Sequence, residues 1–128
     1  MITLNLHNYQ YFDRNPEAVK AINKLFLLQR SIEPRQISSS VGCTFSDSLD
    51  ILFTIYAKEL AIIRVRLYHR LHDFPIYELP MENGPPKFPV FCGECEKDIY
   101  MEESYYTLVF FVQTSITFNV VSENLIEV

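Results

Sequence analysis

The sequence predicts one α+β domain over residues 1–128, with three helices followed by an antiparallel β appendage. Up to about residue 60 apolar residues recur at helical spacing, and from residue 61 they alternate with polar residues as in strands. Apolar residues form 48% of the 128-residue chain, which is enough for one core, and the chain is too short for two ordinary domains. A disordered chain is excluded, because such chains lack the apolar surface that offsets the entropy of folding.

A short strand and a first helix are predicted before residue 32. Residues 2–7 alternate between apolar and polar side chains, which is typical of a strand. Asn15 is a favourable helix cap and Pro16 fits the first helical position, so a helix should begin there. The spacing of the apolar residues predicts that this helix extends over about residues 16–31.

Two further helices follow, separated by a glycine. Pro34 should begin a short helix over residues 34–41, and Gly42 is placed to end it. A third helix is predicted over about residues 46–60, after a capping segment that begins at Thr44. Two helices joined by a short turn that contains glycine form the outline of a helix-turn-helix.

The rest of the chain predicts strands around a proline-rich loop. Residues 61–69 alternate, which indicates a half-buried strand with an arginine face. Five prolines within residues 73–90 exclude a helix there, and a short strand is expected over residues 88–91. Residues 104–112 and 116–121 are rich in Tyr, Phe, Val and Thr, and both segments predict strands.

The order of helix, short helix, glycine turn, longer helix and strand resembles a winged helix-turn-helix over about residues 16–70. Residues 71–128, with a proline-rich loop, the motif Cys92-x-x-Cys95 and aromatic strands, resemble a degenerate zinc knuckle or zinc ribbon appended to the wing. The resemblance implies a small prokaryotic protein encoded beside defence or signalling proteins, antiviral defence included. It also implies DNA binding, the usual function of a helix-turn-helix.

Two cysteines carry the signal for a metal site. Cys92 and Cys95 have the spacing at which two thiolates on one tight turn bind the same Zn²⁺. A structural zinc site needs four ligands and the sequence holds no second C-x-x-C motif, so the further candidates are His69, His72 and Cys43. His69-x-x-His72 comes just after a predicted strand and can meet the knuckle across a hairpin. The predicted cofactor is Zn²⁺, and the alternative is a knuckle without metal whose thiols are packed or exposed.

The sequence holds no enzyme signature. Acidic residues flank the two thiols and would raise their pKa, unlike in a thioredoxin-like redox site, and no βαβ pattern precedes them. The nucleophile motif G-x-S-x-G is missing, and the acidic run from Glu94 to Glu103 lacks the spacing of a calcium loop. We therefore expect a non-catalytic protein in which this run is a solvated face or a docking surface for a basic partner.

Charge is distributed unevenly along the chain. Residues 1–72 carry nine Lys or Arg and six Asp or Glu, a net charge of +3, whereas residues 73–128 carry a net charge of −8. The whole chain has a net charge of −5 and a pI near 5.1. This balance argues against a dedicated nucleic-acid binder, which usually has a basic footprint.

The third predicted helix is a poor recognition helix. It opens with Asp47 and Asp50, at the place where such a helix would approach base edges and phosphates. The alternative function, a winged-helix DNA-binding transcriptional regulator, would therefore contact the phosphate backbone through Arg64, Arg66 and Arg70.

The aromatic strands favour a protein partner. Residues 104–121 place aromatic side chains on both strand faces, at Tyr105, Tyr106, Phe110, Phe111 and Phe118. A strand that is apolar on both faces must be covered on both, or present one face to a partner. We expect a protein–protein interaction adaptor or regulatory subunit that binds another protein or itself as an oligomer, and nucleic acid is the less favoured partner.

Signals for secretion or membrane insertion are not found in the sequence. Residues 1–12 have no basic start and no long apolar run, so no signal peptide is predicted. The most apolar stretch, residues 105–121, is interrupted by polar residues, whereas a membrane span needs about 20 predominantly apolar ones. We expect a cytoplasmic protein with reduced thiols and no membrane partner.

Overall fold

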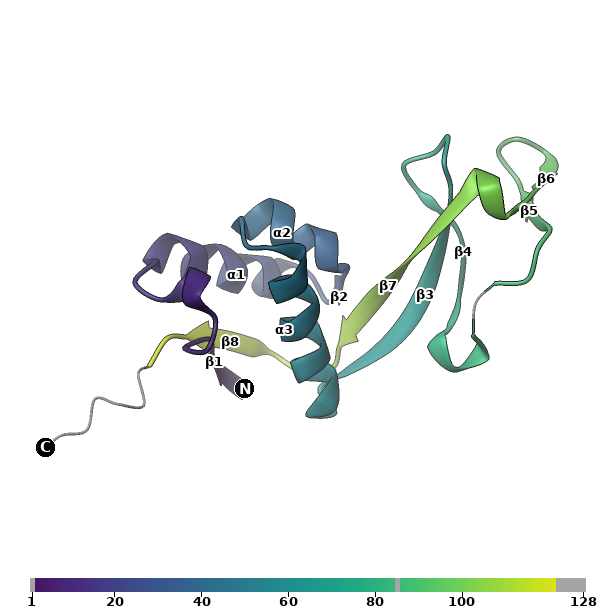
Figure 1. The fold of residues 1–128 in the computed structure, drawn as a ribbon. Coiled ribbons are helices and arrows are strands. Elements are labelled where there is room, and N and C mark those ends of the chain that lie inside the picture. Colours follow the sequence, from purple (N-terminus) through teal and green to yellow (C-terminus); the bar gives the residue numbers. More distant parts are fainter. Residues whose placement is uncertain (1, 85, 122–128) are drawn as a thin grey trace, which may run out of the picture.

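The computed structural model describes residues 2–84 and 86–121, and it confirms the mixed α+β class. In chain order the elements are β1 (Ile2–Asn5), the 3-10 turn η1 (Gln10–Phe12), α1 (Pro16–Leu28), β2 (Ser31–Ile32), α2 (Pro34–Val41), α3 (Phe45–Ala57), β3 (Ala61–His69), β4 (Pro75–Pro80), η2 (Met81–Asn83), β5 (Val90–Cys92), β6 (Lys97–Ile99), η3 (Met101–Glu103), β7 (Ser104–Val112) and β8 (Ile116–Asn119). The helices gather at one end of the molecule, and a long ribbon of β3 and β7 leads to β4, β5 and β6 at the other end (Figure 1). We call these two ends the helical lobe and the distal lobe.

The helices begin close to where the sequence predicts, and two of them end earlier. The side chain of Asn15 caps α1, which stops before Gln29 because the chain becomes extended there and forms β2. α2 has the predicted bounds and ends at Gly42, whose φ of +96° lies in the left-handed region. α3 ends at Ala57, after which Glu59 adopts a φ of +61° and the chain turns into β3. No helix within residues 2–84 and 86–121 is long and apolar enough to cross a membrane.

One apolar cluster fills the helical lobe. Its fully buried side chains come from η1, all three helices, β2 and the end of β7, and include Phe12, Ile22, Ile32, Ile37, Leu52, Ile55 and Phe110. The parallel pair β1 and β8 lies beside α1, and Asn23 of α1 covers the free edge of β8. The Asn23 side chain accepts a hydrogen bond from the Phe118 amide (2.7 Å) and donates one to the Phe118 carbonyl (2.9 Å). The helical lobe therefore has a core of its own.

The antiparallel pairing of β3 with β7 joins the two lobes. It runs over nine residues, from Ala61 opposite Val112 in the helical lobe to His69 opposite Ser104 at the distal end. β2 and β4 complete the sheet in the order β2-β7-β3-β4, so β7 is a central strand. Tyr106 is the one large apolar side chain of β7 that is exposed. Val109, Phe110 and Val112 are buried, whereas Tyr105, Leu108 and Phe111 are partly exposed, so the chain covers β7 only in part.

The short strands of the distal lobe differ from the prediction. β4 lies inside the proline-rich segment, with Pro75 and Pro80 at its ends, and prolines are tolerated at the ends of an edge strand. β5 begins at Val90, two residues later than expected. β6 lies in the acidic run, where the sequence predicted no strand, and pairs with β5 as a hairpin.

A buried carboxylate holds α2 against the ribbon. The side chain of Glu33, the residue before α2, is only 4% exposed. It accepts hydrogen bonds from the Tyr68 hydroxyl (2.5 Å) and from Arg66 (3.2 Å) of β3. Arg35 donates a third one (2.9 Å). Arg66 also pairs with Glu78 of β4 (2.9 Å), so one network of charges connects α2, β3 and β4.

We predict that Glu33→Gln lowers the free energy of unfolding by about 2 kcal/mol in urea denaturation, because Tyr68 and the partly buried Arg66 lose a charged acceptor. The new amide also places a donor where Tyr68 and Arg66 need an acceptor. Glu17→Gln is the control, since Glu17 is exposed and pairs only loosely with Lys20 (3.7 Å), and it should change stability by less than about 0.5 kcal/mol. Equal effects of the two changes would contradict the role of the network.

Candidate metal centre

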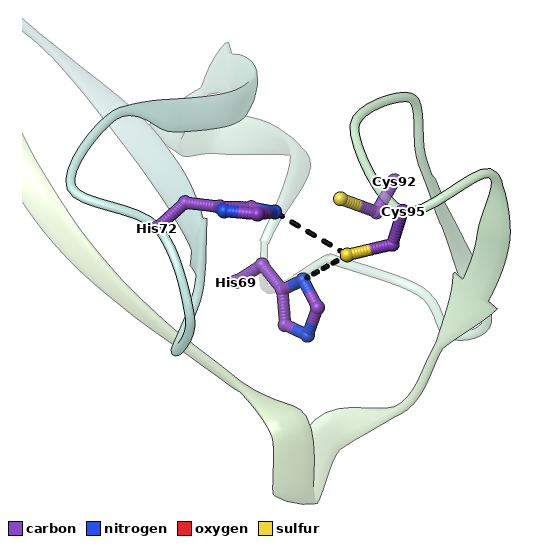
Figure 2. Close-up of side chains that lie close together, drawn as sticks. All are labelled: His69, His72, Cys92 and Cys95. Carbon is purple, nitrogen blue, oxygen red and sulfur yellow. Dashed lines mark hydrogen bonds between the residues drawn. The ribbon is translucent and has the colours of Figure 1, made fainter.

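Four side chains with metal-binding atoms meet at the tip of the ribbon. His69 is the last residue of β3 and His72 lies in the turn that follows, whereas Cys92 ends β5 and Cys95 lies in the turn before β6. The ring nitrogens and sulfur atoms all lie within 4.8 Å of one another (Figure 2). His69 and Cys92 are buried, and the other two are partly buried. Two segments that are twenty residues apart in sequence, from His72 to Cys92, thus supply two ligand candidates each.

Local structure brings the members of each pair together. The His72 amide donates to the His69 carbonyl (2.9 Å), and this tight turn places the two rings 4.9 Å apart, edge to face. In the β5–β6 hairpin the Glu96 amide donates to the Cys92 carbonyl (2.8 Å). Glu96 has a φ of +55°, and the resulting turn returns Cys95 toward Cys92.

The distances fit a tetrahedral metal site. The Cys95 sulfur lies 3.5 Å from Nδ1 of His69 and 3.4 Å from Nε2 of His72. Zn²⁺ binds sulfur at about 2.3 Å and imidazole nitrogen at about 2.0–2.1 Å, so a regular tetrahedron has a sulfur-to-nitrogen edge of about 3.6 Å. The two observed edges are close to that length. Two of the six edges thus match a tetrahedral zinc site, and all six are at most 4.8 Å long.

The donor set indicates the kind of metal and the kind of site. Two cysteine sulfurs with two imidazoles are a ligand combination of structural Zn²⁺ sites. A catalytic zinc site keeps one position open for water or substrate, whereas here four protein ligands would complete the tetrahedron. Desolvation, a hydrogen bond with Cys92 and the charge of Glu94 raise the pKa of Cys95 above its ordinary value.

An aromatic ring supports the site from outside the ligand set. Phe74 stacks on His72, with ring centroids 5.1 Å apart and an interplanar angle of 10°. Phe74 is not predicted from the sequence, because a phenylalanine two residues after a histidine carries no signal by itself. Glu33 is not predicted either, because its partners Arg66 and Tyr68 lie more than thirty residues away in the sequence.

Cys43, the third candidate for the remaining ligand positions, is not part of the cluster. It is buried in the helical lobe, where its sulfur lies 3.5 Å from the Ser48 hydroxyl, and burial raises the pKa of its thiol. The structure therefore brings together both histidines and both knuckle cysteines, and leaves Cys43 in the core.

The three arginines considered for DNA binding all have acceptors within the chain. Arg64 and Arg66 bind the two oxygens of Glu78, at 3.0 and 2.9 Å. Arg70 donates to the backbone carbonyl of Glu102 (3.2 Å). Arg64 and Arg66 are thus engaged in ion pairs, whereas Arg70 is exposed and forms no ion pair within the described residues.

No protein-family model, curated protein or solved structure matches the chain. The geometry and chemistry of the described residues are therefore the basis on which its function is inferred.

Proposed function

We propose that this chain is a non-catalytic protein-interaction module, an adaptor or regulatory subunit, whose distal lobe is held together by one structural Zn²⁺. The observation that carries the proposal is the convergence of His69, His72, Cys92 and Cys95 on one point. β5 and β6 pair only with each other among the described strands, so the metal would join this hairpin to the end of β3. Structural zinc contributes about 10–16 kcal/mol in small zinc peptides, as much as the whole stability of a typical domain.

The surface around the cluster supports an interaction role. Large apolar side chains are exposed near it, at Leu71, Phe74, Phe91, Tyr100 and Met101, with exposed fractions between 46% and 75%. Apolar side chains that gather on a surface mark interaction sites more often than those scattered singly. A site with no open coordination position has no place for a substrate, so we assign these side chains to contact with a protein.

The alternative is a winged-helix DNA-binding regulator, and the topology supports it in outline. α2, the turn at Gly42 and α3 are followed by the antiparallel ribbon of β3 and β7, with β2 on the far edge of β7. In that interpretation the distal lobe is an enlarged wing. We place it second, because Asp47 and Asp50 lie on α3 and because Arg64 and Arg66 are engaged in ion pairs.

We predict that protein purified without chelator contains about one zinc per chain, measured by elemental mass spectrometry. Cys95→Ser and His69→Ala should each lower the content below about a tenth of an equivalent, because a complete structural site binds far more tightly than an incomplete one. Cys43→Ser is the matched control and should keep the metal. Wild-type protein that stays below a tenth of an equivalent after incubation with equimolar Zn²⁺ would show that the cluster is not a zinc site.

Removal of the metal should destabilise the distal lobe and leave the helical lobe folded. In hydrogen-exchange mass spectrometry we expect a chelator to speed exchange in residues 70–103, while α1 and α3 stay protected by the core of the helical lobe. Zn²⁺ should restore the protection and Mg²⁺ should not, because Mg²⁺ prefers oxygen ligands. Equal loosening of both lobes would contradict a site whose effect is local.

The two proposed functions predict different affinities for DNA and different effects of salt on that affinity. We expect no sub-micromolar binding of a duplex in fluorescence anisotropy, whereas a regulator would bind with an affinity that falls steeply with salt. Arg64→Ala combined with Arg70→Ala tests the wing and leaves the pair of Glu33 and Arg66 intact. If the wild type bound a duplex tightly and the double variant did not, the interaction module would be contradicted and the DNA-binding regulator supported.

A further inference from the structure

We propose that the protein partner is a second copy of this chain, bound head to tail. The outer face of the β5–β6 hairpin of one copy would dock into an apolar groove between α1 and β8 of the next copy. The proposal rests on the proposed function in one respect, since zinc is what holds the hairpin in place. The groove belongs to the helical lobe and does not depend on the metal.

The groove has an apolar floor and a basic rim. It has a volume of about 450 Å³ and is lined by Asn23, Lys24, Phe26, Leu27, Arg30 and Ser115–Thr117. Leu27 is 82% exposed, the largest exposed fraction among the large apolar side chains of the described residues. Lys24 and Arg30 are cationic, and no Asp or Glu lines the groove. Its chemistry therefore fits an apolar anchor that is flanked by carboxylates.

The β5–β6 hairpin presents such an anchor. Phe91 of β5 lies directly opposite Asp98 of β6, so the two side chains project from the same face of the hairpin. Both are exposed, with Phe91 at 60%. The other face carries Cys92 and Ile99, which are buried. The outer face thus places a phenyl ring beside a carboxylate.

The acidic side chains of the hairpin are exposed, and they are not neutralised by ion pairs with cations of the described residues. Glu94 and Glu96 are exposed in its turn, and no ion pair joins them or Asp98 to a cation within residues 2–84 and 86–121. The one lysine of the hairpin, Lys97, is paired with Glu103 (3.2 Å). Opposite charges at the rim of an interface steer association and set its orientation. The acidic hairpin and the basic groove are complementary in this sense.

The arrangement of the lobes directs this contact to another copy. The hairpin lies at the far end of the β3–β7 ribbon from the helices (Figure 1). A strand of nine residues is about 30 Å long, and the ribbon keeps the two surfaces apart in one chain. Docking between different surfaces of two copies is heterologous, and it builds rings or open chains rather than a symmetric dimer.

Sedimentation velocity on zinc-loaded protein over a wide concentration range tests the proposal. We expect the wild-type chain to form dimers and larger species. Leu27→Glu should disable the groove and Phe91→Lys the hairpin, and each should weaken association by at least about tenfold, or 1.4 kcal/mol. The matched control is Leu28→Glu, because Leu28 is exposed on the same helix but does not line the groove.

Mixing the two disabled variants gives the decisive measurement. Leu27→Glu retains an intact hairpin and Phe91→Lys an intact groove, so an equimolar mixture should form a heterodimer that grows no further. A mixture that remains monomeric while the wild type associates would overturn the head-to-tail contact, and so would a wild type that is monomeric throughout. Zinc is measured in the same samples: metal-free chains that still complement each other would overturn the zinc centre and leave the contact standing.

Discussion

The pairing of β3 with β7 is the constraint on which the rest of the structure depends. Its register places the residues at odd positions of β3 up to Leu67 in buried positions, and leaves Arg64 and Arg66 partly exposed at even ones. A slip of one residue would exchange the two faces, burying both arginines and turning His69 away from the hairpin. Because one end of the ribbon is fixed in the apolar core of the helical lobe, the register set there also positions His69, a candidate metal ligand, at the other end.

The distal lobe has too little apolar material to be ordered by burial alone. β5 and β6 have three residues each, and an isolated hairpin of that size is at best marginally stable in water. Assemblies below about 40 residues usually need a metal, a disulfide or a partner. All three cysteines are free, so a disulfide does not supply the link. Each of the two segments supplies two ligand candidates, and Phe74 packs on His72, so the metal that we propose would tie the lobe together.

Signals that act over a few residues predicted much of this architecture. Caps and prolines marked the helix starts, alternation marked β3, and the C-x-x-C spacing marked half of the ligand set. Pairings between distant segments could not be predicted, because β8 joins β1 and β7 joins β3 through contacts that no local pattern specifies. For the same reason the sequence could not show that both histidines, and not Cys43, lie beside the two cysteines. That depends on where the turn after β3 meets the hairpin. The role of Glu33 could not be predicted either, because its bond to Tyr68 spans 35 residues.

The ion pairs that fix the ribbon also decide which charges remain for a partner. Arg66 donates to both Glu33 and Glu78, so contact with a phosphate would draw it away from carboxylates to which it is bound, one of them buried. Arg64 shares Glu78 with Arg66, so it is tied to the same network. The exposed charges that form no ion pair within the described residues include the basic rim of the groove and the acids of the hairpin, which lie at opposite ends of the molecule. A partner that binds at both surfaces must have an acidic, apolar anchor for the groove and a basic, apolar groove for the hairpin. A second copy of this chain has both.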